Sequence, residues 1–176
     1  RDFCLSRGLG DVYKRQALLY GVDGEIKWDI DRNWFVSFNA TWQKSLDYSK
    51  YIAGTNTESE TYKMQLPHIP ILFFNWMLDY RKDNPFGGKG QYARAYYEGG
   101  YTDKYYYGYE LSRHQDYKIP SACLHTVGLE YGIMNRKVLF GVECHNLFDT
   151  DEMTNFNYPL AGRTVMAKIR FTTLKW

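Results

Sequence analysis

Hydrophobic and polar positions alternate with a period of two along most of the chain, which is the pattern of β-strands rather than of helices. The alternation is clearest at 34–42, where one face carries Trp34, Val36, Phe38, Ala40 and Trp42 and the other carries Ser37, Asn39 and Thr41. Further alternating runs start near residues 20, 69, 90, 119, 138 and 164. The pattern therefore predicts an all-β fold, an antiparallel meander of about seven long strands.

The predicted connections alternate between short and long. Short turns are expected at 31–33, 83–88 and 134–136, and long loops at 46–64, 104–118 and 149–162. This layout is typical of outer-membrane barrels, and the strands are long enough to cross a bilayer when tilted. Soluble sandwiches and lipocalin-like barrels also use alternating strands, so a soluble module remains an alternative at this point.

The two faces of the predicted sheet differ in chemistry. In the run 69–80 the even-numbered positions from Leu72 to Tyr80 are the better candidates for a lipid-facing surface. Aromatic residues near the short turns, Trp28, Trp34, Tyr80 and the C-terminal Trp176, are typical of an interfacial girdle. The opposite, lumen-facing set contains charged residues that we expect to form a cross-strand polar ladder, with a solute path as the alternative: Arg94, Glu98, Glu130, Glu143, His145, Lys168 and Arg170.

Composition narrows the class of protein. The chain has 17 Tyr, 10 Phe and 5 Trp in 176 residues, which is too much apolar ring surface for a disordered chain. No run approaches the roughly 18 consecutive apolar residues that a membrane-spanning helix requires. The segment 1–16, RDFCLSRGLGDVYKRQ, has no strand or helix period and resembles a non-native leader, so the domain is predicted to be 17–176.

The leader also accounts for the charge. The formal net charge of the chain is +2, and segment 1–16 contains four basic and two acidic residues, which leaves 17–176 neutral. A nucleic-acid partner is therefore not expected. The leader has no apolar core of a signal peptide, so the N-terminus of an exported protein is expected to lie upstream.

Candidate chemistry is sparse. Cys123 and Cys144 fall on neighbouring predicted strands but about four positions out of register, so we expect two free thiols. Four scattered histidines, His68, His114, His125 and His145, lack the spacing of metal ligands, and no catalytic motif or phosphate-binding loop is present. We expect no enzyme activity, no metal and no cofactor.

The C-terminal motifs resemble those of a known family. Asn146-Leu147-Phe148-Asp149 is followed by Tyr158-Pro159-Leu160-Ala161-Gly162-Arg163 at the start of the last strand, and the chain ends on aromatic Trp176. This is similar to the C-terminal end of TonB-dependent outer-membrane receptors, and the segments 66–70 and 118–120 resemble strand starts of that family. Gly162 is expected to adopt a backbone conformation that other residues avoid.

The resemblance implies a fold and a role. Receptors of this family have barrels of about 22 strands with a plugged lumen. The chain would be the C-terminal part of such a barrel in the bacterial outer membrane, importing a scarce large solute such as a siderophore, a cobalamin or an oligosaccharide. Its partners would be outer-membrane lipid, the missing strands and plug domain of the same chain, TonB through that missing part, and the imported solute.

The tyrosine-rich loop is the best candidate for solute contact. Tyrosine rings offer flat surfaces with a polar tip that suit sugars or aromatic chelators. The candidates are Tyr105, Tyr106, Tyr107, Tyr109 and His114, next to Lys104 and Arg113. The alternative, which we favour, is that these rings form the outer aromatic girdle or pack loop on loop. For the whole chain, a small independent outer-membrane barrel or adhesin, and a soluble β-sandwich or lipocalin-like binding module, remain alternatives to the receptor.

Overall fold

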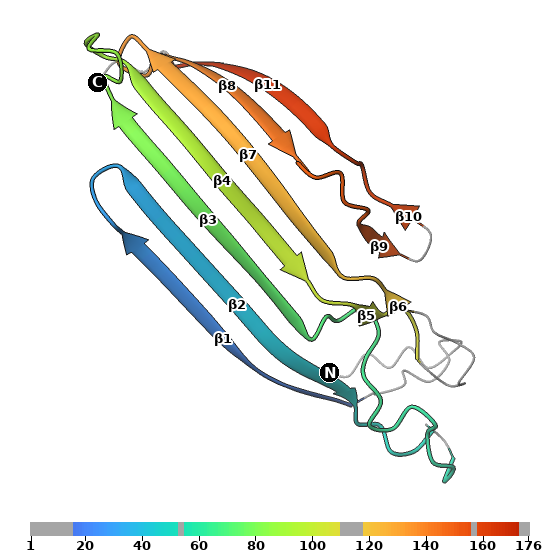
Figure 1. Ribbon diagram of the computed structural model, residues 1–176. Helices are drawn as coiled ribbons and strands as arrows, with labels where there is room; N and C mark the ends of the chain where they lie inside the picture. The colour runs from blue at the N-terminus through green and yellow to red at the C-terminus, as the bar shows by residue number, and fades with distance from the viewer. Residues whose placement is uncertain (1–15, 53–54, 110–117, 156–157, 173–176) are drawn as a thin grey trace, which may run out of the picture.

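The computed structural model describes residues 16–52, 55–109, 118–155 and 158–172. Seven long strands form one antiparallel sheet in the order β1-β2-β3-β4-β7-β8-β11 (Figure 1). They are β1 (Ala17–Asp29), β2 (Trp34–Asp47), β3 (Leu72–Asp83), β4 (Tyr92–Thr102), β7 (Ala122–Ile133), β8 (Val138–His145) and β11 (Thr164–Phe171). The predicted all-β meander of seven strands is confirmed. No helix in the described part of the chain is long and apolar enough to cross a membrane.

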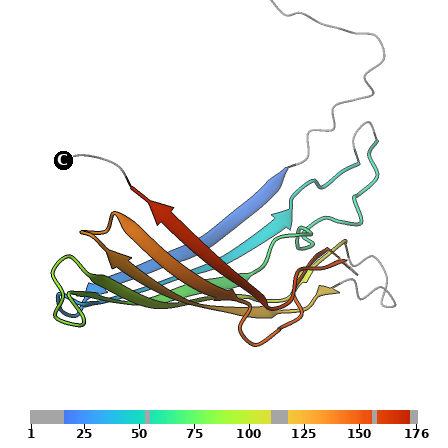
Figure 2. The same cartoon turned by 90° about the horizontal axis from the view of Figure 1, so that it is seen from above.

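Two short ribbons lie at one end of the sheet. β5 (Tyr105–Tyr106) pairs with β6 (Lys118–Ile119), and β9 (Met153–Asn155) pairs with β10 (Tyr158–Pro159). The long connections that contain them leave from the same end, whereas the short turns lie at the opposite end (Figure 1). The sheet is curved, with β1 and β11 rising at its two edges (Figure 2).

Local chemistry explains the short turns. The Asp31 carboxylate Oδ1 accepts hydrogen bonds from the backbone N–H groups of Asn33 and Trp34, both at 2.7 Å, which closes the first turn. In the third turn Met134, Asn135 and Arg136 all have positive φ, between 53° and 63°. This left-handed run reverses the chain within four residues, as the predicted turn requires.

The register confirms the predicted faces. Phe38 in β2 stands between Ile26 of β1 and Trp76 of β3. At the other edge of the sheet, Cys144 of β8 stands between Val127 of β7 and Val165 of β11, and Val142 lies two positions before it on the same face. Even-numbered positions of β3 therefore lie on the apolar face, as predicted. Cys144 is opposite Val127 while Cys123 is opposite Tyr101, and both are free thiols, which confirms the expectation for the cysteines.

Several predicted boundaries are wrong. The loop predicted at 46–64 instead spans 48–71, because β2 continues to Asp47 and β3 begins only at Leu72. Pro67 and Pro70 have no amide hydrogen to donate, and His68 between them has φ of 60°, so this segment cannot join the ladder. The strand predicted from 119 begins at Ala122 because Ile119 pairs with β5 instead and Pro120 intervenes.

The chain ends were predicted separately from the sheet. Residues 1–15 of the expected leader lie outside the described residues, as does Trp176. Gln16, which the prediction grouped with the leader, is described, and its carbonyl oxygen accepts a hydrogen bond of 2.8 Å from the backbone N–H of Tyr48. Backbone hydrogen bonding at this edge therefore extends one residue beyond β1, whose pairing with β2 begins at Ala17.

The described residues bury little apolar surface. Tyr92, Ile119 and Ala122 are the buried hydrophobic residues, together with the buried polar residues Ser45, Asp47, Asp79 and Asn146. On the apolar face, by contrast, Val22 is 69% exposed and Ile169 is 61% exposed. A second layer over this face is absent from the described part of the chain, so a soluble sandwich core is not observed there.

Candidate functional site

The polar face of the sheet carries a network of ion pairs near the short-turn end. Its centre is the Asp79 carboxylate of β3, which is fully buried. Arg94 of β4 donates to Asp79 Oδ2 from Nη2 at 2.6 Å, and Arg81 donates from Nε and Nη2 at 3.0 and 2.9 Å. Two guanidinium groups therefore neutralise one buried carboxylate, which is the condition for keeping a charge out of water.

The network continues across the remaining strands. Arg94 Nη1 lies 3.5 Å from Glu130 Oε2 of β7, and Lys168 Nζ of β11 lies 2.9 Å from Glu130 Oε1. Lys168 also pairs with Glu143 of β8, and His145 Nε2 lies 3.4 Å from Glu143 Oε2. Five of the seven charged residues predicted for this face are thus linked into one chain of contacts.

Glu98 and Arg170 lie outside this network. Arg170 is exposed and stands opposite Leu139 at the edge of the sheet, whereas Glu98 lines a separate pocket. Sequence reasoning missed Asp79 and Arg81, because they follow an apolar run in which no pattern marks a buried charge. Their alternation with Leu78 and Tyr80 is the signal that places them on the polar face.

Tyr96 connects β4 to β8 over an intervening glycine. Its ring lies where a Cβ at Gly128 would stand, and its hydroxyl is hydrogen-bonded to Glu143 two strands away. The Arg94 guanidinium lies over this ring, 4.5 Å from its centroid. A side chain at position 128 would close this path, so the glycine is required for the close approach.

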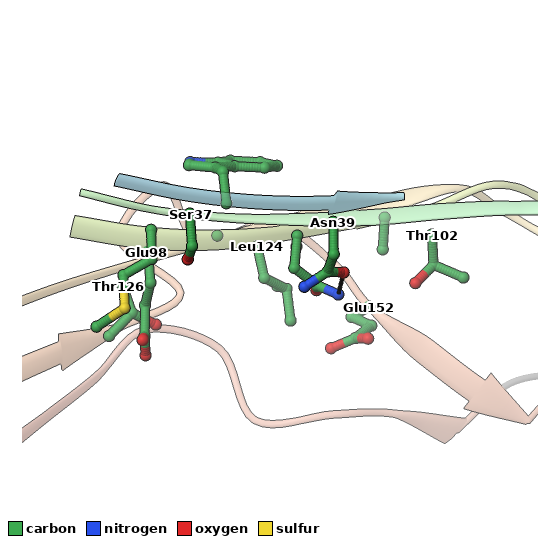
Figure 3. Close-up of a pocket in the computed structure, with 13 residues that line it drawn as sticks. Ser37, Asn39, Glu98, Thr102, Leu124, Thr126 and Glu152 are labelled. Carbon is green, nitrogen blue, oxygen red and sulfur yellow. Dashed lines mark hydrogen bonds between the residues drawn. The ribbon is translucent and has the colours of Figure 1, made fainter. Parts of the chain in front are cut away.

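Toward the long loops the polar face contains a pocket of about 450 Å³. Seven of its lining residues are labelled in Figure 3 and project into the same space: Ser37, Asn39, Glu98, Thr102, Leu124, Thr126 and Glu152. Asn75 Nδ2 donates to Asn39 Oδ1 at 3.0 Å. With two carboxylates and several amide and hydroxyl groups, the lining can accept and donate hydrogen bonds to a polar solute.

The predicted tyrosine cluster is divided between several contacts. Tyr105 and Tyr106 form β5, and the Tyr107 ring lies 5.1 Å from the His68 ring of the preceding loop. Tyr109 donates its hydroxyl to Asp47 Oδ2 at 3.2 Å. Burial raises the pKa of the Tyr105 hydroxyl above its usual range, and the charge of Glu152 adds to this. His114 and Arg113 lie outside the described residues.

Asp47 joins the end of β2 to two long loops. It lies five residues beyond Trp42, the last ring of that strand on the apolar face. Its side chain accepts hydrogen bonds from Ser49 N at 2.9 Å and Thr61 Oγ1 at 2.8 Å. Burial acts to raise the pKa of Asp47, but these bonds and the one from Tyr109 outweigh it and hold the pKa below the ordinary value of 3.8. The loop contacts therefore favour the ionised form.

This cluster predicts an acid-sensitive loop arrangement. Because the folded-state pKa is depressed, the stabilisation is fully present above pH 3.8 and is lost as the pH falls through the lower folded value. Hydrogen exchange of the Ser49 and Lys63 amides should show protection factors that are constant from pH 7 to about pH 5 and then fall on further acidification. Asp47→Asn, which cannot ionise, is the control and should remove this pH dependence. An unchanged acid profile in Asp47→Asn would contradict the assignment.

The two C-terminal motifs contact each other. Asn146 has φ of 50° and exchanges two hydrogen bonds of 2.8 Å with the backbone of Thr150, which shapes the turn after β8. Asp149 Oδ1 accepts from the backbone N–H of Arg163 at 2.7 Å, and Arg163 Nε donates to the Leu147 carbonyl at 2.9 Å. The contacts clamp the long loop at its base. Side chains of Phe148 and Leu160 are exposed, and Pro159 lies in β10 after Tyr158.

The reason predicted for Gly162 is wrong. Its φ is not in the left-handed region; instead, a Cβ there would lie 2.6 Å from Asp149 Oδ1. Gly162→Ala should therefore weaken the clamp and destabilise the fold by about 1–2 kcal/mol. Gly24→Ala, where nothing lies within 4 Å of the added Cβ, is the matched control and should be neutral in the same urea titration. Equal effects of the two substitutions would contradict the role assigned to Asp149.

The apolar face carries many exposed large hydrophobic side chains. Four of the five tryptophans lie on it, Trp28, Trp34, Trp42 and Trp76, and the fifth lies outside the described residues. Trp34 and Tyr80 pack together near the short turns with ring centroids 4.7 Å apart. In the described residues no group of three or more His, Cys, Asp or Glu side chains is placed to hold a metal ion.

Comparisons with known proteins place this sheet in a structural context. No known protein-family model matches the chain, and no curated protein matches it. Among solved structures it is similar to the crystal structure of the ferric yersiniabactin uptake receptor FyuA from Yersinia pestis, with a TM-score of 0.63 and 15% sequence identity. The match covers 88% of this chain and 22% of that receptor, so the chain spans about a fifth of its length. The likeness concerns the fold alone: the seven-stranded antiparallel sheet is similar to part of that structure.

Proposed function

We propose that the chain is part of the wall of a TonB-dependent outer-membrane receptor that imports a scarce large solute. The observation that carries the proposal is the division of one curved sheet into two unlike faces. One face is an exposed band of large apolar side chains, and the other holds buried charge pairs and a polar pocket. A barrel wall between lipid and an aqueous or plug-filled lumen requires this division.

The apolar face supports a membrane location. Val22, Ile26, Trp28, Leu129 and Val165 are each more than half exposed, which in water would be an unusually large apolar patch. In a bilayer the same side chains contact lipid, and the backbone groups are satisfied by neighbouring strands. The outer-membrane site, the lipid partner and the continuation of the barrel in further strands of the same chain follow from this proposal.

The polar face and the loops support the import role. The pocket offers two carboxylates, amides and hydroxyls, which suit a polar solute such as a siderophore, a cobalamin or an oligosaccharide. The tyrosine-rich segment 105–109 is the proposed external contact, and a plug domain and TonB would act through parts of the protein outside this chain. The solved uptake receptor with a similar fold is consistent with such a role.

Fractionation of the full-length protein that contains this chain tests the location. Expressed with a tag in a Gram-negative host, it should sediment with the outer membrane and migrate faster on gels when it is not heated. Recovery in the soluble fraction without detergent, with no heat-dependent change in migration, would contradict the proposal and favour a soluble binding module.

Genetic interaction with TonB tests the import role separately. A deletion of the gene should reduce growth when one of three solutes is limiting: an iron-siderophore, cobalamin or an oligosaccharide. On that solute, the growth defect of the double deletion with tonB should be no greater than the defect of either single deletion. Additive defects would indicate a barrel that works without TonB, such as an independent porin-like wall or an adhesin.

A further inference from the structure

A thiol, an imidazole and a phenol form a chain of contacts on the apolar face near the long-loop end. Cys123 and His125 are two positions apart in β7, so their side chains share one face. Cys123 Sγ lies 3.4 Å from His125 Nε2, and the Tyr97 hydroxyl of β4 lies 2.6 Å from His125 Nδ1. Both nitrogens of the imidazole are therefore engaged, one by a potential nucleophile and the other by an orienting group.

Three aromatic rings fix the orientation of the His125 imidazole. Trp76 meets it edge to face with centroids 5.4 Å apart, and Phe148 does so at 4.8 Å. The Tyr97 ring is nearly parallel to it, with an interplanar angle of 16°. These rings come from β3, β4 and the turn after β8, so the imidazole is held from three separate segments of the fold.

We propose that Cys123 is a nucleophilic thiol that His125 activates and Tyr97 positions, and that it adds to α,β-unsaturated carbonyl compounds in the membrane. When Nδ1–H donates to the Tyr97 oxygen, the lone pair of Nε2 faces the thiol. Thiolate is the reactive form of cysteine. A base within hydrogen-bond reach of the nucleophile, and itself oriented by a third group, is the arrangement that activates nucleophiles in proteins.

The addition needs no oxidant or external cofactor. His125 Nε2 takes the thiol proton as the sulfur forms a bond to the β-carbon of the electrophile. The π electrons of the carbon–carbon double bond move to the α-carbon and its carbonyl as an enolate. The proton then passes from the imidazolium to the α-carbon, which leaves a thioether and restores neutral His125.

The class of electrophile follows from the position of Cys123. It stands opposite Tyr101, one row from the end of the β4–β7 pairing, on the face where the large apolar side chains lie. Unsaturated aldehydes that form when acyl chains oxidise partition into this region of a bilayer. The choice of electrophile rests on the proposed membrane location, whereas the reactivity of the thiol rests only on the His125 and Tyr97 contacts.

Cys144 provides a matched internal control. It lies on the neighbouring strand β8 on the same face, opposite Val127 and Val165, and like Cys123 it is half-buried. No hydrogen bond from Cys144 to a base is found within the described residues. With limiting N-ethylmaleimide and the full-length protein in detergent, Cys123 should be alkylated at least about tenfold faster than Cys144, as quantified by peptide mass spectrometry.

Two substitutions separate activation from simple accessibility. His125→Gln should slow alkylation of Cys123 by about tenfold and leave the rate at Cys144 unchanged. Tyr97→Phe keeps the ring and removes only the hydroxyl that orients His125, so it should slow alkylation of Cys123 by about threefold. Tyr101→Phe, in the same strand and on the same face, should have no effect. The unchanged rate at Cys144 reports that each variant remains folded.

The proposal has clear contrary results. Equal rates at Cys123 and Cys144 in the unmodified protein, or a Cys123 rate that His125→Gln and Tyr97→Phe leave unchanged, would overturn the activated thiol. In vesicles, treatment with nonenal should give an adduct at Cys123. An adduct that forms in detergent but not in vesicles would overturn the membrane electrophile while leaving thiol activation intact. The fractionation experiment tests the membrane location independently, so a failure of this proposal can be distinguished from a failure of the proposed function.

Discussion

Asp79→Ala is expected to lower the free energy of unfolding by about 3–5 kcal/mol, the usual cost of breaking a buried ion pair from one side. The carboxylate is fully buried and accepts four hydrogen bonds from Arg81 and Arg94. Without it, two guanidinium groups remain close together on the polar face, and the ion pair left to Arg94 is the longer one with Glu130. Urea unfolding of the protein in vesicles, followed by tryptophan fluorescence, measures the effect.

Asp23→Ala is the matched control for this experiment. Asp23 is an exposed aspartate on the polar face of β1, and its removal should change the free energy of unfolding by less than about 0.5 kcal/mol. Asp79→Asn keeps the shape and removes the charge, and it should fall between the two. If Asp79→Ala is as stable as Asp23→Ala, the ion-pair network does not hold the strands together.

Leu129→Arg should destabilise the protein by about 2–4 kcal/mol, because it places a charge on the proposed lipid-facing surface away from the strand ends. Leu129 is 59% exposed on the apolar face of β7. In a soluble protein a substitution at such an exposed site would be nearly neutral. The size of the effect in vesicles therefore reports whether lipid contacts this face.

Met166→Arg is the control at the same depth. Glu143 of β8 stands between Met166 of β11 and Gly128 of β7. Leu129 directly follows Gly128, so Met166 and Leu129 lie in adjacent rows of the sheet. Met166 is 48% exposed but belongs to the polar face. Its replacement should change stability by less than about 0.5 kcal/mol. Equal costs at the two sites would contradict the assignment of the faces.

The alternation of side chains was sufficient to predict the sheet. A period of two determines which residues share a face, and Asp31-Arg32-Asn33 marks the first turn, so strand order and faces followed from local pattern. The start of β3 was missed because residues 69–71 are as apolar as the strand itself. There the two prolines and the positive φ of His68, rather than hydrophobicity, decide where pairing begins.

Long-range contacts explain the remaining differences. The clamp between Asp149 and Arg163 joins residues 14 positions apart. Gly162 is required because the Asp149 side chain comes close to it, and not because of its backbone conformation. The link from Tyr97 to His125 depends on the register of β4 against β7, which the sequence does not reveal. The sequence does indicate that Cys123 and His125 lie on the same face, because residues two apart in a strand share a face.

The division between a lipid-facing and a polar face is tested most directly by a spin-label scan along β2. With the native cysteines replaced by serine, single nitroxide labels at 36, 37, 38, 39, 40 and 41 are compared in vesicles for collision with oxygen and with a water-soluble nickel chelate. Labels at Val36, Phe38 and Ala40 should collide readily with oxygen and poorly with the chelate, whereas labels at Ser37, Asn39 and Thr41 should lack this oxygen access. Equal access of the chelate to both sets would place the apolar face in water, and low access of both reagents at the even positions would place it in a protein core; either result would contradict a membrane barrel wall.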